Sequence, residues 1–277
     1  MKWQALGIGL AGLAFAGPLS AQDAEPTIEM WRLDCGTIEL SDTGPFSDAH
    51  LYDGEPRTLT DSCYLIRNGD RYLLWDTGLP AALKGTSMTQ GVFTVSIERT
   101  IVEQLGDLEL SPSDISFVGL SHYHDDHIGQ AADFPGATLL MSANDIAAIR
   151  DRPIESAAQQ LAPWISGGGA IADFSRDHDV FGDGRVTIVA TPGHTPGHSA
   201  LLVRLPETGD VLLSGDLYHF REQIENRGVP QFNTDRADTL ASMERFMQID
   251  EALEAIIVIQ HDPGDIERLP AFPEAAR

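Results

Sequence analysis

The chain has 277 residues, of which 42% are hydrophobic, so it is long enough to bury a complete core in one large α/β domain. Its 18 basic and 42 acidic residues give a formal charge of −24 at pH 7. This excess of negative charge argues against a nucleic-acid partner and against an anionic membrane surface, because both are polyanions.

The beginning of the chain has the pattern of a secretory signal peptide. Lys2 gives a positive start, residues 5–16 are uncharged and largely apolar, and residues 19–21 resemble a cleavage site that ends in a small residue. The apolar run is too short to span a bilayer. We therefore expect residues 1–21 to be removed and residues 22–277 to form a single domain, periplasmic or secreted, with no membrane attachment.

The first half of the chain reads as strands followed by one helix. Alternation and β-branched residues predict strands over 28–40, 62–67 and 71–75, the last two joined by an Asn-Gly turn. Residues 41–58 and 81–94 are expected to be irregular. The spacing of Ile97, Ile101 and Leu105, followed by Gly106, predicts an amphipathic helix that ends at a glycine.

Two cysteines, Cys35 and Cys63, fall in predicted strands. An exported protein permits a disulfide between them, but the sequence does not show whether their Cα atoms are close enough. Neither has a CxxC partner or a neighbouring histidine, so both are weak metal ligands. A disulfide and a pair of buried thiols both stay open.

A short apolar segment, residues 115–120, predicts a buried strand that leads into an unusual cluster. The six positions that follow Ser121 hold His122, His124, Asp126 and His127. Ligands bind at strand ends in α/β folds, and imidazole and carboxylate groups are zinc ligands. In extended backbone, His122 and His124 point the same way and can bind one ion, while Asp126 and His127 can face a second.

The second half repeats the pattern of strands that end in polar residues. We predict strands over 137–141, 186–190, 199–205, 211–213 and 255–259, a helix over 142–150 capped by Ser142, a helix around Met243, and a mobile insertion over 151–170. His194, Asp216 and His261 follow three of these strands. Asp76 closes the strand 71–75 and, beside the histidine cluster, is expected to orient a metal-bound imidazole.

The seven candidate ligands are too many for one four-coordinate ion. They suit two ions that share a bridging carboxylate and hold an activated hydroxide between them. The chemistry that follows from such a site is hydrolysis.

The pattern His122-x-His124-x-Asp126-His127, followed by His194, Asp216 and His261 and preceded by Asp76-Thr77-Gly78, resembles the metallo-β-lactamase superfamily. The resemblance implies an αββα four-layer sandwich with the metal site at the edge between the two sheets. It implies two Zn²⁺ ions, with other divalent transition metals also compatible. By the same resemblance the first ion takes His122, His124 and His194, the second takes Asp126, His127 and His261, and Asp216 bridges them. His198 matches a position that does not bind metal.

The flanking segments 60–66, 215–218 and 229–233 resemble the N-acyl homoserine lactonase family, especially its exported branch. The resemblance implies a small-molecule substrate, an N-acyl homoserine lactone, whose ring is opened by hydrolysis. Asp126 and Tyr218 are the catalytic candidates. The best-known members of the family carry a tyrosine three positions after the bridging aspartate, where this chain has His219, so whether Tyr218 or His219 assists the leaving group stays open. A homodimer is compatible with the sequence, but nothing in it specifies one.

Other members of the superfamily are alternatives. The β-lactamase pattern lacks the bridging carboxylate, and glyoxalase II-like thioesterases usually add basic residues for glutathione, which we do not find here. An RNase Z activity fits poorly with the charge of −24. A persulfide dioxygenase needs only one iron and fewer ligands. A protein that binds the metals without catalysis is the alternative from a different class.

Overall fold

The computed structural model of the chain describes residues 1–3, 27–152 and 154–277. Nearly all of the predicted signal peptide, its predicted cleavage site and residues 22–26 lie outside the described residues. Within the described part, no helix is both long and apolar enough to cross a membrane.

Two β-sheets form the centre of the fold. The larger sheet has the strand order β4-β5-β1-β2-β3-β6-β7-β8, and the smaller has the order β13-β12-β11-β10-β9. The strands of the larger sheet are β1 (Ile28–Leu40), β2 (Arg57–Asn68), β3 (Arg71–Trp75), β4 (Ser87–Gln90), β5 (Phe93–Ser96), β6 (Phe117–Gly119), β7 (Thr138–Ser142) and β8 (Ile171–Phe174). Those of the smaller sheet are β9 (His178–Asp179), β10 (Val186–Ala190), β11 (Ser199–Leu205), β12 (Gly209–Leu213) and β13 (Ile256–Val258).

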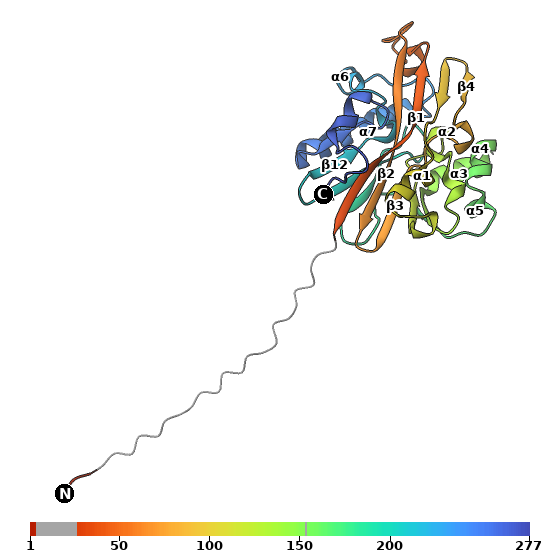
Figure 1. The fold of residues 1–277 in the computed structure, drawn as a ribbon. Coiled ribbons are helices and arrows are strands. Elements are labelled where there is room, and N and C mark those ends of the chain that lie inside the picture. The colour runs from red at the N-terminus through yellow and green to blue at the C-terminus, as the bar shows by residue number, and fades with distance from the viewer. Residues whose placement is uncertain (4–26, 153) are drawn as a thin grey trace.

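Helices lie on the outer side of each sheet. They are α1 (Ile101–Asp107), α2 (Asp125–Ile128), α3 (Ala143–Asp151), α4 (Glu155–Gln160), α5 (Ala162–Ile165), α6 (Glu222–Asn226) and α7 (Arg236–Leu253). Figure 1 shows α1 to α5 on the side of the larger sheet and α7 beside β12 on the other side. The predicted αββα four-layer sandwich is therefore confirmed.

Three apolar clusters explain the layers. Between the sheets, Trp75 and its neighbours from the larger sheet pack against residues such as Leu201 of the smaller one. Outside the larger sheet, Leu105 and Ile146 contact the sheet's other face, and outside the smaller sheet Phe246 of α7 does the same. The central strands thus bury alternate side chains on two faces, as strands in the middle of four layers must.

Strand direction brings the candidate ligands to one edge. In the larger sheet β3 and β6 are parallel, so Asp76 and the His122 loop leave the sheet at the same end. In the smaller sheet β12 and β13 are parallel, and β10 runs with them because both β10 and β12 are antiparallel to β11. The residues that follow β10, β12 and β13 therefore meet at one rim.

The structure corrects two predictions for residues 81–106. The segment expected to be irregular contains the hairpin of β4 and β5, which extends the larger sheet beyond β1. The helix begins at Ile101 rather than Ile97, because Thr100 caps it in a capping box with Glu103. Gly106 lies inside the helix and does not end it.

The expected mobile insertion at residues 151–170 is also wrong. The segment forms α4 and α5, and its Ala157, Leu161 and Trp164 are buried in the core outside the larger sheet. The indole of Trp164 donates a hydrogen bond to the Ala137 carbonyl at 2.8 Å. Its prolines and glycines suggested a loop, but apolar burial holds the segment in place.

The two cysteines form a disulfide that joins the neighbouring strands β1 and β2. Cys35 and Cys63 have Cα atoms 5.9 Å apart, and both side chains are fully buried. Gly78 lies against them with φ +59°, and a Cβ at this position would overlap Cys35. The disulfide therefore supports the turn that carries Asp76.

Gly129 allows the histidine loop to lie against the Asp76 turn. Its backbone N–H donates to the Gly78 carbonyl at 2.7 Å, and a Cβ would overlap backbone atoms of Gly78, Leu79 and Pro80. We expect Gly129→Ala to lower Tm by roughly 5 °C, because overpacking costs about 1–3 kcal/mol.

Calorimetry of Gly129→Ala beside Gly136→Ala tests this expectation. A Cβ at Gly136 meets no described atom within 4 Å, so that variant controls for the change of residue type. Equal melting temperatures for the two variants would show that the close approach at Gly129 has no cost.

Candidate metal centre

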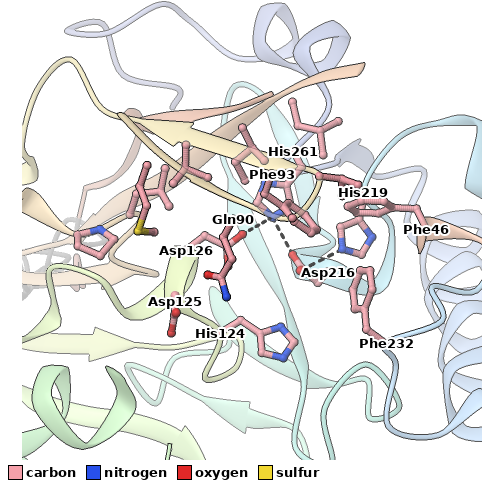
Figure 2. A pocket seen from close by; sticks show the side chains of 18 residues that line it. Phe46, Gln90, Phe93, His124, Asp125, Asp126, Asp216, His219, Phe232 and His261 are labelled. Atoms are coloured by element: carbon pink, nitrogen blue, oxygen red, sulfur yellow. Dashed lines mark hydrogen bonds and ion pairs between the residues drawn. The ribbon is translucent and has the colours of Figure 1, made fainter. Parts of the chain in front are cut away.

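The seven predicted ligands converge in two neighbouring groups. One contains His122, His124, His194 and Asp216, and the other contains Asp126, His127 and His261. Within each group one candidate ligand atom per residue lies within 4.8 Å of all the others. Figure 2 shows His124, Asp126, Asp216 and His261 directed toward one another at the floor of a cavity.

Two of the imidazoles in the first group, those of His122 and His124, are held in the neutral form. His194 Nε2 lies 3.1 Å from His122 Nε2 and 2.9 Å from His124 Nδ1. Burial lowers the pKa of His122 well below its usual value, and burial together with the neighbouring His194 lowers that of His124 to about 3. Imidazoles that are neutral at pH 7 present bare lone pairs, which is the form that binds a metal ion.

Asp216 lies between the two groups. Its Oδ1 is 3.1 Å from His127 Nε2 and 2.9 Å from His261 Nε2, whereas its Oδ2 is 3.2 Å from His194 Nε2. Burial by itself would raise its pKa, but the surrounding imidazoles, His127 and His261 foremost, hold the pKa of Asp216 well below its usual range. One oxygen therefore faces each group, which is the geometry of a bridging carboxylate.

The second group is in contact with two carboxylates, its own Asp126 and the Asp216 that faces both groups. Asp126 has its two oxygens 3.8 Å from His127 Nε2 and 3.9 Å from His261 Nε2. Burial opposes a positive charge on these imidazoles, yet Asp216 and Asp126 raise the pKa of His261 to about 9 and that of His127 well above its usual value. Carboxylates gathered at buried imidazoles favour a cation at this position.

Asp76 orients His127. The Nδ1–H of His127 donates to Asp76 Oδ2 at 2.9 Å, which leaves Nε2 facing Asp216. Asp76 is fully buried, and it also accepts hydrogen bonds from the Ser121 backbone N–H at 2.7 Å and the Gln260 amide at 3.0 Å. This is the contact that we predicted for Asp76, and such partners fix the tautomer of a metal-binding imidazole.

Two other histidines are oriented in the same way by groups that we did not predict. His261 Nδ1 lies 2.8 Å from the Thr60 carbonyl, and His194 Nδ1 lies 2.8 Å from Asn233 Oδ1. In both, the N–H on Nδ1 donates and Nε2 is directed into the centre. A backbone carbonyl and a distant asparagine leave no recognisable pattern beside the histidines in the sequence.

Buried side chains also form hydrogen bonds that hold the loops carrying His194 and Asp216 in place. His198 is buried, as expected for a structural residue, and its Nε2 accepts a hydrogen bond from the Asp216 backbone N–H at 2.9 Å. The buried carboxylate of Asp145 accepts from Thr195 Oγ1 at 2.8 Å and from the Gly197 backbone N–H at 2.6 Å. Burial raises the pKa of Asp145 to about 7. No pattern in the sequence indicates this role of α3.

Tyr218 does not reach the centre. Its side chain is buried beneath α7, where the ring packs against Phe246 and the hydroxyl lies 3.5 Å from the Met243 carbonyl. His219 lies on the other side of the chain, where it lines the cavity with its Nε2 3.1 Å from Asp216 Oδ2 (Figure 2). Tyr218 therefore does not make the expected catalytic contact, and it is His219 that reaches the cavity.

A cavity of about 500 Å³ opens above the two groups. The β4–β5 hairpin supplies one wall, and Phe46 and Phe232 lie opposite, next to His219. The remaining lining residues are acidic or imidazole side chains at the metal centre and, on the apolar side, Ile38, Leu59, Leu79 and Pro80. Among the described lining residues there is no lysine or arginine. The cavity therefore suits a ligand with an uncharged, apolar portion.

The donor set fits a pair of divalent metal ions. Five histidines and two carboxylates offer nitrogen and oxygen ligands, three of the imidazoles are oriented by further hydrogen bonds, and one carboxylate faces both groups. Borderline metals such as zinc favour this mixture of ligands.

The fold and these residues define a metal-dependent hydrolase, and the chain belongs to the metallo-beta-lactamase superfamily, whose family model matches residues 57–261. The resemblance found in the sequence is thereby confirmed. The chain is 32% identical over 189 residues to N-acyl homoserine lactonase AttM of Rhizobium radiobacter, covering 62% of this chain and 68% of that protein. It is 27% identical over 232 residues to N-acyl homoserine lactonase AiiA of Bacillus thuringiensis subsp. kurstaki, covering 81% and 90%.

A solved structure agrees with these relatives. It is that of an N-acyl homoserine lactone hydrolase with the product N-hexanoyl-L-homoserine bound at its catalytic metal center. The two chains are 25% identical and superpose with a TM-score of 0.76, over 90% of this chain and 99% of the other.

Proposed function

We propose that this protein is an exported dinuclear zinc hydrolase that opens the lactone ring of N-acyl homoserine lactones. The observation that carries the proposal is the position of the apolar cavity directly above two groups of metal ligands. A fatty acyl arm matches the apolar walls, and the lactone carbonyl matches the polar floor. The similarity to lactonases over most of the chain supports the same substrate.

In the proposed reaction, the residues of the chain place the ester against the floor of the cavity. When bound, the two zinc ions would polarise the carbonyl and supply hydroxide as the nucleophile. His122, His124 and His194 would hold one ion, Asp126, His127 and His261 the other, and Asp216 both. The hairpin and Phe46 bind the acyl arm and exclude water from it.

Asp126 has a further role in this proposal. Its side chain is 25% exposed and lines the cavity, whereas the other carboxylate of the centre, Asp216, is 5% exposed. It is thus the acidic group of the centre with the best access to a bound substrate. We assign Asp126 the transfer of a proton, which it accepts from the attacking water, to the alkoxide that leaves when the ring opens.

The predicted signal peptide supports the proposed location in a periplasm or outside the cell. A disulfide between Cys35 and Cys63 agrees with it, because disulfides persist in oxidising compartments. Detection of the protein in periplasmic and culture fractions, with and without residues 1–21, tests this part of the proposal.

The activity is tested with purified, zinc-quantified protein. N-hexanoyl and N-decanoyl homoserine lactone are supplied in parallel with nitrocefin and S-lactoylglutathione, and hydrolysis is followed by acid release or by absorbance. We expect turnover of the lactones and little of the other two, because glutathione and β-lactam substrates carry carboxylates and the described cavity lining offers no lysine or arginine. Preferential turnover of either control would replace the lactonase proposal with that activity.

A further inference from the structure

His219 differs from the five histidines of the two metal-binding groups. It is almost fully buried and lines the same cavity, and its only hydrogen-bonding partner among the described residues for either ring nitrogen is Asp216. The contact joins His219 Nε2 to Asp216 Oδ2 at 3.1 Å. Its Nδ1 is buried and has no partner in the described part of the chain.

The tautomers of the neighbouring histidines follow from their partners. His127, His194 and His261 each direct Nδ1 at an acceptor oxygen, so each carries its hydrogen on Nδ1 and presents a bare Nε2 to the centre. A bare nitrogen binds a metal ion but donates nothing to a carboxylate. In the metal-loaded protein these three imidazoles therefore leave Asp216 without an N–H donor.

His219 has the opposite arrangement. Since no described acceptor faces its Nδ1 and a carboxylate oxygen faces its Nε2, the hydrogen belongs on Nε2. We propose that His219 is a positioning residue that donates this Nε2–H to Asp216 Oδ2 and so holds the carboxylate in its bridging orientation. The inference rests on the pair of metal ions in the proposed function.

The surroundings of His219 fix its ring. Phe46 packs edge-on against the imidazole with ring centroids 4.8 Å apart, and the His261 ring stacks on it at 5.8 Å. Its backbone N–H donates to Gln223 Oε1 at 2.6 Å, and the Gln223 amide donates to the Phe46 carbonyl at 3.1 Å. This network gives the Nε2–H one direction, toward Asp216.

The distances around Asp216 show which of its two oxygens lacks a second close partner. Oδ1 lies 2.9 and 3.1 Å from two imidazole nitrogens, whereas Oδ2 has one nitrogen of its own group at 3.2 Å and the next, His122 Nε2, only at 3.7 Å. A hydrogen bond from His219 fills the remaining lone pair of Oδ2 and resists rotation of the carboxylate toward His127 and His261.

Two variants of His219 distinguish the effect of its hydrogen-bond donor from the effect of its ring packing. His219→Phe keeps an aromatic ring but removes the donor, and His219→Gln restores an amide N–H near the position of Nε2. His178→Phe, at a half-buried histidine in β9, is the matched control. Each protein is loaded with zinc, its metal content is measured by mass spectrometry, and its affinity is measured by chelator competition. The cobalt-loaded forms are compared by their visible spectra, and melting temperatures establish folding.

We expect His219→Phe to bind one or both metal ions about 10–100-fold more weakly and to alter the cobalt spectrum, because loss of a partner of a metal ligand has effects of this size. His219→Gln should recover most of the affinity, and His178→Phe should match the unaltered protein. If His219→Phe does not fold, His219→Met provides a flexible side chain without a donor.

Two results would overturn the proposal. Wild-type affinity and spectrum in folded His219→Phe would remove His219 from the centre. Loss of a full equivalent of metal in both His219→Phe and His219→Gln, as in His261→Ala, would make it a ligand instead. None of these measurements uses a lactone, so a failure of the lactonase proposal would be recognised separately.

Discussion

Asp216→Asn is expected to lower kcat/KM for an N-acyl homoserine lactone by about 10³-fold or more, with the fold retained. The substitution keeps the size of the side chain but replaces one carboxylate oxygen by an NH₂ group. In the structure each oxygen faces one group of ligands, so the amide presents hydrogens to one of them and removes the negative charge between both. Polarisation by a metal is worth several kcal/mol, and each 1.36 kcal/mol is tenfold in rate.

The measurement for Asp216→Asn combines steady-state kinetics with metal analysis. We expect the variant to bind less than the full complement of zinc. Addition of a chelator should therefore lower its melting temperature less than it lowers that of the unaltered protein. Asp173→Asn, at an exposed position of β8, is the control for the chemical change and should be fully active. Turnover within a few-fold of wild type in metal-analysed Asp216→Asn would contradict the bridging role.

Loss of the Cys35–Cys63 disulfide should have the largest effect on stability. The bridge joins residues separated by 28 positions, and the chain-entropy relation for a loop of this length gives about 3–4 kcal/mol in the free energy of unfolding. Because Gly78 packs against the bridge, we also expect the turn that carries Asp76 to loosen. Metal should therefore be lost at a lower denaturant concentration than in the unaltered protein.

Denaturant unfolding of the unaltered protein with and without reductant, beside the double variant Cys35→Ala/Cys63→Ala, measures this effect. The double variant should be destabilised under both conditions and should not respond to the reductant. Thiol titration of the unfolded, unreduced protein should find no free thiol. Two free thiols in that titration, or equal stabilities with and without reductant, would show that the bridge does not contribute.

The two groups of ligands illustrate what sequence patterns reveal. Each of the seven side chains follows, or lies close behind, an apolar strand, and parallel strands of one sheet end at one edge, so their convergence follows from local patterns. The groups that orient them, such as the Thr60 carbonyl and Asn233, come from elsewhere in the chain. Only the tertiary fold places them beside the histidines.

The local backbone explains why His219, and not Tyr218, lines the cavity. Gly215 has φ +52°, and residues Gly215–Leu217 form a single 3-10 turn after β12. This turn directs residue 218 toward α7 and residue 219 toward the cavity. An offset of one residue depends on such backbone geometry, which counting from Asp216 does not reveal.

The β4–β5 hairpin was missed because the four β4 side chains are all exposed and so show no apolar alternation. It lies at the free edge of the larger sheet, beyond β1, whereas the metal ligands follow β6, β10, β12 and β13. In the proposed function, the hairpin that contacts the acyl arm and the residues that carry out hydrolysis are therefore in separate parts of the molecule. Changes in this hairpin can diversify the range of compounds accepted over evolutionary time while the reaction itself is preserved.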